Sequence, residues 1–261
     1  MSAIIPRGAT EIAQTDQLET ILGVFQSLVA TKTNEMYGFE LLECIIANFP
    51  TSALEKYYVP ILQLLFTRLQ TSKTDTFALR FVRLYHFISA KDDKGFGADF
   101  FINIVEQVQA NVFVQLYPGI ILPDTAKLLR PLDRKTAVIS LTKTLTSSQA
   151  FAERYGQKGW GLTAKALLQL LENPPVPPNS TEDTAVAEQD PDDVSFGVSF
   201  TQLTTIRRPA KDAWPEIVDV KAWVGEYLRD ADEKTNRKIS GFAQQRLEGE
   251  VQQVFGSYMR K

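Results

Sequence analysis

The stretch that decides the fold is ISGFAQQRLEGEVQQVFGSYM, residues 239–259. Apolar side chains recur in it at steps of three and four residues, and polar side chains fill the positions between them. Because an α-helix turns once in about 3.6 residues, this spacing places the apolar side chains on one helix face. A single helix would leave that face in water, so the stretch predicts a partner surface in the same fold. The apolar positions are Ile239, Phe242, Ala243, Leu247, Val251, Val254, Phe255, Tyr258 and Met259.

The same period continues through most of the chain and predicts an all-α fold. A short alternation of apolar and small residues at 194–200 is the one strand-like signal, and it has no obvious partner strand. Pro60 is expected to divide its helix near Val59, because proline removes a backbone donor and clashes with the preceding turn. Pro118 and Pro123 are expected to break another helix for the same reason. The predicted helices span 16–31, 34–49, 53–71, 75–90, 97–110, 111–130, 133–147, 160–173, 218–233 and 240–259.

The helix spacing predicts antiparallel hairpins stacked into an α-solenoid. Helices beginning near 34, 75, 133 and 218 are each followed by a second helix after a short link, so we expect these two to pair. The first interval is about 40 residues, which is the period of HEAT-type repeats. Such repeats depend on their neighbours to bury their apolar faces. A globular helical bundle remains the alternative fold.

Residues 173–206, here called the acidic insert, interrupt the helical pattern. They begin with Asn-Pro-Pro-Val-Pro-Pro and contain no Lys or Arg. Low hydrophobicity with unbalanced charge predicts a flexible loop between repeats. The insert is either a solubilising linker or a site that engages a basic partner surface. Its candidate partner-binding residues are Glu182, Asp183, Glu188, Asp190, Asp192 and Asp193.

Lys127, Arg130, Arg134 and Lys135 form a basic cluster around one predicted helix–helix junction. The cluster is either a solvated face or a docking point for an acidic partner, since arginine forms bidentate contacts with carboxylates. Exposed aromatic residues do not interleave with it, which argues against a groove for nucleic acid. The net charge of −3 also predicts no bulk attraction to nucleic acid or to anionic membranes.

The sequence offers no residue pattern typical of catalysis, of a cofactor site or of a metal site. One His and one Cys exclude a zinc site of the Cys/His type. Cys44 lies in an apolar run and is expected to be buried and inert, and His86 is expected to be structural or on the surface. The glycines at 95–97 and 156–161 lack a phosphate-loop ending. We therefore predict a protein that is not an enzyme.

Membrane and secretion signals are also missing from the sequence. No apolar run approaches the roughly 20 residues that span a bilayer. The residues at 1–7 do not begin a signal peptide, because no apolar stretch follows a charged head. The expectation is an intracellular protein that does not bind membranes.

Several blocks of the sequence resemble the C-terminal region of the CAS/CSE exportins, which return importin-alpha to the cytoplasm. The most specific block is Leu64-Leu65-Phe66-Thr67-Arg68-Leu69-Gln70-Thr71-Ser72-Lys73-Thr74. The other blocks, in the same order along the chain, are 22–28, 38–42, 61–63, 118–123, 134–138 and 200–203.

The resemblance implies a HEAT-repeat solenoid of the importin-beta superfamily, acting as a nuclear export receptor. Its implied partners are importin-alpha and Ran-GTP, and its implied location is the nucleus and cytoplasm, with passage at the nuclear envelope. The family's receptors are far longer, and much of their Ran binding lies in N-terminal repeats that this chain lacks. The resemblance therefore implies a C-terminal segment, and helix 16–31 is expected to expose an apolar face. A generic helical scaffold without a transport role is the alternative.

Overall fold

The computed structural model describes residues 5–13, 15–173 and 212–260, and these residues form helices and connecting turns without a strand. This confirms the all-α prediction. The alternation at 194–200 lies outside the described residues. The helices are α1 (Ile5–Ala13), α2 (Gln17–Val29), α3 (Glu35–Asn48), α4 (Thr51–Thr71), α5 (Asp75–Ala90), α6 (Ala98–Val108), α7 (Phe113–Leu116), the π-helix η1 (Tyr117–Ile121), α8 (Leu122–Thr125), α9 (Pro131–Ser147), α10 (Gln149–Arg154), α11 (Gly159–Glu172), α12 (Val220–Lys234), α13 (Lys238–Arg246) and α14 (Gly249–Met259).

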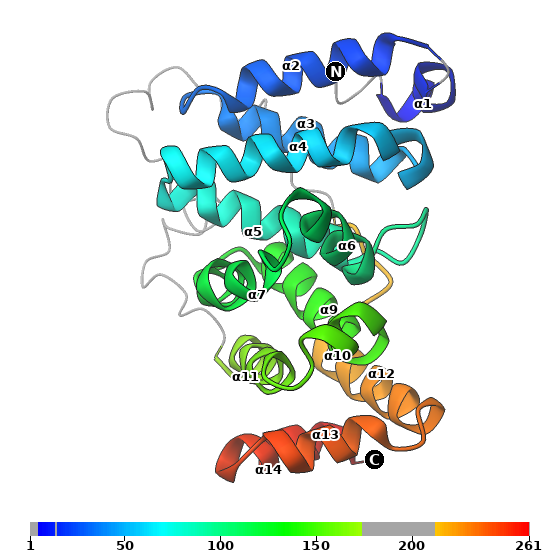
Figure 1. The fold of residues 1–261 in the computed structure, drawn as a ribbon. Coiled ribbons are helices and arrows are strands. Elements are labelled where there is room, and N and C mark those ends of the chain that lie inside the picture. The colour runs from blue at the N-terminus through cyan, green and yellow to red at the C-terminus, as the bar shows by residue number, and fades with distance from the viewer. Residues whose placement is uncertain (1–4, 14, 174–211, 261) are drawn as a thin grey trace, which may run out of the picture.

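The helices stack in two rows from α1 and α2 at one end to α13 and α14 at the other (Figure 1). In one row α2 contacts α4, α4 contacts α6 and α6 contacts α10, and further along α11 contacts α13 and α14. In the other row α3 contacts α5, α5 contacts α9 and α9 contacts α12. This is the HEAT-repeat solenoid that the spacing predicted. The pairing was wrong in one respect, because α3 packs chiefly against α2 and α5 rather than against α4.

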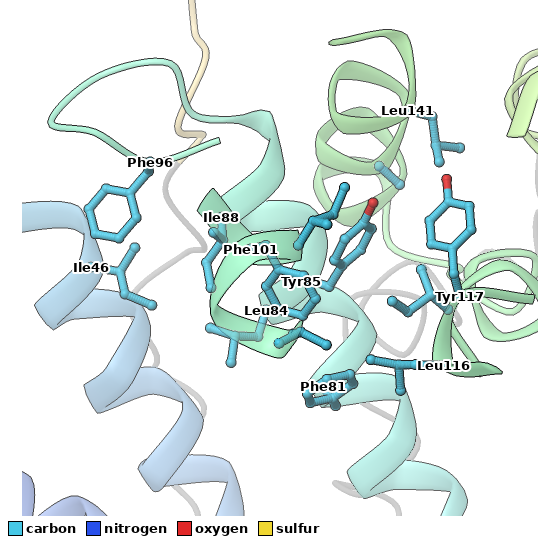
Figure 2. Packing of buried hydrophobic residues seen from close by; sticks show 14 of the residues in the cluster. Ile46, Phe81, Leu84, Tyr85, Ile88, Phe96, Phe101, Leu116, Tyr117 and Leu141 are labelled. Carbon is cyan, nitrogen blue, oxygen red and sulfur yellow. The ribbon is translucent and has the colours of Figure 1, made fainter. Parts of the chain in front are cut away.

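A continuous apolar core runs between the two rows, from Ile5 to Phe255. Figure 2 shows its middle part, where aromatic side chains of α5, α6 and η1 meet. The rings of Tyr85 and Phe101 lie edge to face with centroids 4.9 Å apart, and those of Tyr85 and Tyr117 are 6.0 Å apart. Burying each such side chain contributes roughly 1.5–3 kcal/mol. The core is shared between neighbouring helices, so no hairpin is complete by itself.

Helix α9 lies at the centre of the stack and is buried around its whole circumference over 137–145. It contacts α5, α11 and α12. Two of its buried hydroxyls are satisfied within the helix: Thr142 Oγ1 donates to the Val138 carbonyl and Thr144 Oγ1 to the Ser140 carbonyl, each at 2.8 Å. Such back-bonding allows a helix with a polar sequence to occupy a core position.

Pro60 lies inside α4, and the prediction that it divides this helix is wrong. The side chain of Pro60 is exposed, so the carbonyl of Lys56, which loses its donor, lies on the side open to water. Apolar residues on the opposite face hold both halves of the helix on the same core. Burial of that face therefore outweighs the loss of one hydrogen bond.

Pro118 likewise does not end its helix, because the chain passes through a π turn there. Residues 113–125 remain helical, with η1 between α7 and α8. A π turn inserts one extra residue and shifts the hydrogen-bond register, which accommodates a residue without a backbone donor. The expected break at Pro118 and Pro123 is thus a change of register. Chain direction is kept, and Tyr117 and Ile121 stay buried.

Two further differences concern the ends of the stack. The predicted helix 240–259 is two helices, which separate at Leu247 and Glu248, with Gly249 at φ +56°. Leu247 stays buried, so the apolar period continues across the break. The apolar face of the predicted helix 16–31 is not exposed, since α2 packs against α3 and α1 and buries Phe25 and Val29. The expectation of an uncovered face was therefore wrong.

A buried carboxylate joins α3, α4 and α5. Glu35 accepts from Arg68 Nη2 at 2.7 Å and from Arg80 Nη1 at 3.0 Å, and its side chain is 1% exposed. Arg68 also lies over the Phe77 ring, 5.1 Å from its centroid. Helices α3 and α5 belong to one row and α4 to the other, so this network fixes the two rows relative to one another.

We predict that Glu35→Gln destabilises the fold by about 3–5 kcal/mol, because it removes the buried carboxylate that accepts hydrogen bonds from Arg68 and Arg80. Urea unfolding followed by circular dichroism measures this loss. The exposed pair Lys234–Asp230, at 2.6 Å, supplies the control. Asp230→Asn should cost no more than about 0.5 kcal/mol, and equal losses for the two variants would contradict the assignment.

Candidate partner-binding surface

His86 and Cys44 are the single histidine and the single cysteine of the sequence, and both take part in the packing. The side chain of His86 is fully buried, with Nδ1 3.0 Å from Ser140 Oγ and Nε2 2.7 Å from Thr125 Oγ1. Burial lowers its pKa to about 3. His86 is therefore structural, as predicted. Cys44 is half-buried, which differs from the expected full burial, and burial raises the pKa of its thiol and keeps it protonated.

Within 5–13, 15–173 and 212–260, no three His, Cys, Asp or Glu side chains gather in a group that could hold a metal ion. The described helices are all too short or too polar to cross a bilayer. An apolar cavity of about 20 Å³ lies between α3, α4, α5 and α6, with no polar atom at its surface.

Arg134, on the first turn of α9, holds the end of α11. Its Nη2 donates to the carbonyls of Leu170 at 2.7 Å and Asn173 at 2.6 Å, and its Nη1 donates to that of Leu128 at 3.1 Å. Carbonyls at the end of a helix lack donors from their own helix, and the planar guanidinium supplies several at once. Partial burial lowers the pKa of Arg134. The side chain thus serves this chain's own fold.

Lys135 is engaged in the same way with the segment that precedes α12. Its Nζ donates to Asp212 Oδ2 at 2.7 Å and to the Trp214 carbonyl at 2.8 Å. Burial opposes ionisation of Asp212, but hydrogen bonds from Lys135 and the Trp214 backbone, together with the Lys135 charge, lower the pKa of this carboxyl. Trp214 packs edge to face on Phe87 of α5, with centroids 6.2 Å apart.

Lys127 and Arg130 complete the basic cluster in the turn between α8 and α9. Lys127 is 60% exposed and pairs with Asp124 at 2.6 Å, one turn earlier. Arg130 is half-buried at the residue before α9. Next to them Leu129 is 60% exposed. The structure therefore brings the four predicted cations together but divides them, with Lys127 facing solvent and Arg134 and Lys135 facing the protein.

Adjacent residues on α9 thus hold both described ends of the chain around 174–211. Arg134 binds Asn173, and Lys135 binds Asp212 and Trp214. The sequence signals both cations but not their partners, which lie 39 and 77 positions away. The six predicted acidic residues, Glu182, Asp183, Glu188, Asp190, Asp192 and Asp193, lie outside the described residues.

We predict that Arg134→Lys lowers the free energy of unfolding by about 1.5–3 kcal/mol, because an ammonium cannot reach three carbonyls on two elements. Urea unfolding measures the change. Lys234→Met removes one member of an exposed ion pair; it is the control and should stay within about 0.5 kcal/mol of the parent. If Arg134→Lys leaves the free energy of unfolding unchanged, the guanidinium does not hold α11 on α9.

We also predict that stability falls on acidification through His86. Its folded pKa of about 3 lies below its ordinary value of 6.5. The unfolded chain therefore takes up the proton first, so the stability is present above pH 6.5 and is lost as the pH falls towards 3. At pH 5 the loss is about 2 kcal/mol. The difference in unfolding free energy between the parent and His86→Gln should shrink by that amount from pH 7.5 to pH 5, and an unchanged difference would contradict it.

Known proteins resemble the chain along nearly its whole length. The family model described as CAS/CSE protein, C-terminus, matches residues 1–258. The importin-alpha re-exporter of Schizosaccharomyces pombe is 31% identical, over 99% of this chain and 27% of that protein. Exportin-2 of Drosophila melanogaster is 28% identical, over 99% of this chain and 26% of that protein.

A solved structure, the exportin Cse1 in its cargo-free, cytoplasmic state, superimposes with a TM-score of 0.71 at 27% identity. The match covers 92% of this chain and 24% of that protein. The chain therefore spans about a quarter of the length of its relatives. Since the family model covers nearly every residue and the stacked helices follow the Cse1 fold, the chain belongs to the CAS/CSE protein family and corresponds to its C-terminal region.

Proposed function

We propose that this chain is part of a nuclear export receptor that carries importin-alpha out of the nucleus together with Ran-GTP. The observation that carries the proposal is the family match over residues 1–258. The names of the relatives, importin-alpha re-exporter and exportin-2, support the cargo and the direction of transport. A receptor of this kind shuttles between nucleus and cytoplasm and passes the nuclear envelope with its cargo.

The proposed mechanism is binding without catalysis. Two rows of stacked helices present an extended surface whose curvature follows from small rotations between neighbouring hairpins. A rotation at several junctions changes which residues reach a large partner at the same time. Ran-GTP is proposed to bind mainly through N-terminal repeats of the full receptor. The segment described here supplies part of the surface for importin-alpha.

Within the basic cluster, we assign different roles to different residues. Lys127 faces solvent and is the proposed contact to an acidic partner surface, with Arg130 beside it. Arg134 and Lys135 are proposed to act by positioning, because their donors are engaged by carbonyls and by Asp212. The acidic side chains of the insert, residues 182–193, are proposed contacts to a basic partner surface.

Calorimetric titration with importin-alpha, with and without Ran held in its GTP state, tests the proposal. Binding that strengthens with Ran-GTP and weakens with salt supports a charged cargo surface, since salt screens exposed charge pairs. No binding to either protein would contradict a cargo surface on this segment. Pull-down of unrelated partners in place of importin-alpha would favour a generic helical scaffold.

Charge reversal at Lys127 gives the residue-level prediction. Lys127→Glu should weaken importin-alpha binding about two- to five-fold and reduce its salt dependence, because an exposed charge contributes at most about 1 kcal/mol. Thermal unfolding of the variant measures the separate cost of a second carboxylate beside Asp124, whose side chain is 8% exposed, and binding is compared at a temperature where the variant is folded. Neutralising the six insert carboxylates to Asn and Gln in a second variant tests the other proposed contact. Unchanged affinity in both variants would remove these residues from the interface.

A further inference from the structure

His86 lies where three elements of the middle of the stack meet. It belongs to α5, and its ring nitrogens reach Ser140 of α9 and Thr125 at the end of α8. All three side chains are buried, with exposed fractions of 1% or less. Thr125 in turn donates from Oγ1 to the carbonyl of Ile121, the last residue of the π-helix η1, at 2.6 Å. These contacts form one continuous series of hydrogen bonds from α9 to η1, here called the hydrogen-bond chain.

The hydrogen bond from Thr125 to Ile121 determines which atom donates in each of the other hydrogen bonds of this series. A threonine hydroxyl has one proton, and a carbonyl can only accept. Since the Thr125 proton is used on Ile121, the 2.7 Å contact with His86 Nε2 requires that Nε2 donate. The reverse arrangement would leave two oxygen lone pairs facing each other at 2.6 Å inside the core. Nε2 therefore carries a proton.

The protonation state of the second ring nitrogen, Nδ1, follows from burial. A doubly protonated ring would place an unpaired charge in the core, which is costly. The charged groups on the neighbouring turns are paired elsewhere: Asp124 binds Lys127, and Lys143 Nζ binds the Ala90 carbonyl and Asp92. Nδ1 consequently bears no proton and accepts from Ser140 Oγ at 3.0 Å.

Titratable tyrosines also border the site without supplying a charge. The Tyr85 ring lies edge-on to the imidazole, with centroids 5.0 Å apart. Tyr117 of η1 uses its hydroxyl on Thr163 of α11 at 2.9 Å. Burial raises the pKa of both phenols, so they stay neutral. One turn before His86 on α5, Arg83 pairs with Asp133 at 3.0 Å. Among the described residues, the carboxylates nearest to His86 are therefore paired with cations and are not available to stabilise an imidazolium.

We infer that a directed hydrogen-bond chain, Ser140 to His86 to Thr125 to Ile121, locks the π turn onto α5 and α9, with His86 held as the neutral tautomer protonated on Nε2. The place of this chain in the fold gives it a mechanical role. Along one row α7 contacts α6, and α8 contacts α11, so the segment from α7 to α8 bridges the two halves of the stack. A change of helix register stored at η1 would shift one half against the other, and the chain holds that register.

The tautomer can be observed directly because His86 is the only histidine in the sequence. Long-range ¹⁵N–¹H correlation spectra of the uniformly labelled protein at pH 7 should show one histidine, with a protonated Nε2 and a pyridine-type Nδ1. A protonated Nδ1, or rapid averaging of the two nitrogens, would overturn the inference. The measurement needs no variant and so does not depend on whether a variant folds.

Variants of the two hydroxyl partners of His86 should respond differently. Ser140→Ala should keep the proton on Nε2, because Thr125 still requires a donor. Thr125→Val removes that requirement and should move the proton to Nδ1, which can then donate to Ser140. An unchanged tautomer in Thr125→Val would show that Thr125 does not set the direction.

Hydrogen exchange tests the lock itself. Thr125→Val should accelerate amide exchange at least ten-fold across 117–125 and in the facing turn of α5. Thr142→Val is the matched control, since Thr142 is equally buried and also donates to a carbonyl of its own helix but is not part of the chain. Equal acceleration of 117–125 in both variants would mean that loss of any buried hydroxyl loosens the π turn, and would overturn the lock.

Discussion

The structure depends on the burial of one helix, α9, around its whole circumference. A helix in this position must satisfy every polar group without water. Its threonines do so by donating to carbonyls one turn earlier, and Lys143 does so by reaching the carbonyl of Ala90 at 2.7 Å and Asp92 at 2.9 Å. Because Ala90 ends α5, the same lysine supplies a donor to a helix end that would otherwise lack one. Lys143 thereby fixes the end of α5 to α9.

The same helix organises the candidate binding surface. Arg134 and Lys135 begin α9 and hold Asn173 on one side and Asp212 and Trp214 on the other. The residues on either side of 174–211 are thus both held at the start of α9. In the proposed receptor, Arg134 and Lys135 contribute the geometry that they impose, and the exposed Lys127 is the proposed contact to the partner.

Much of the fold could be predicted from the sequence because helical periodicity is a local signal. The helix at 75–90 is found with the predicted bounds, and the one at 133–147 begins two residues earlier, at Pro131. Errors arose where tertiary burial outweighs local preference. Pro60 stays inside α4 because the opposite face is packed, and the register change at Pro118 keeps Tyr117 in the core.

The candidate site could be predicted only in part. Composition identified the cations at 127–135, but the sequence does not say which of them face inward, since their partners lie far away along the chain. The hydrogen-bond partners of His86 could not be predicted for the same reason, because these hydroxyls lie 39 and 54 positions away in the sequence. Family membership was accessible because blocks such as 64–74 keep their order, and the family match over 1–258 confirms it.

Native-state hydrogen exchange followed by mass spectrometry tests the central position of α9 most directly. If the solenoid depends on this helix, amides of 137–145 exchange only through global unfolding and are the slowest in the chain, together with those of α5. Amides of α1 and α14, at the ends of the stack, then exchange through local opening at much lower free energy. Exchange of α9 as fast as that of α1 or α14 would contradict the account.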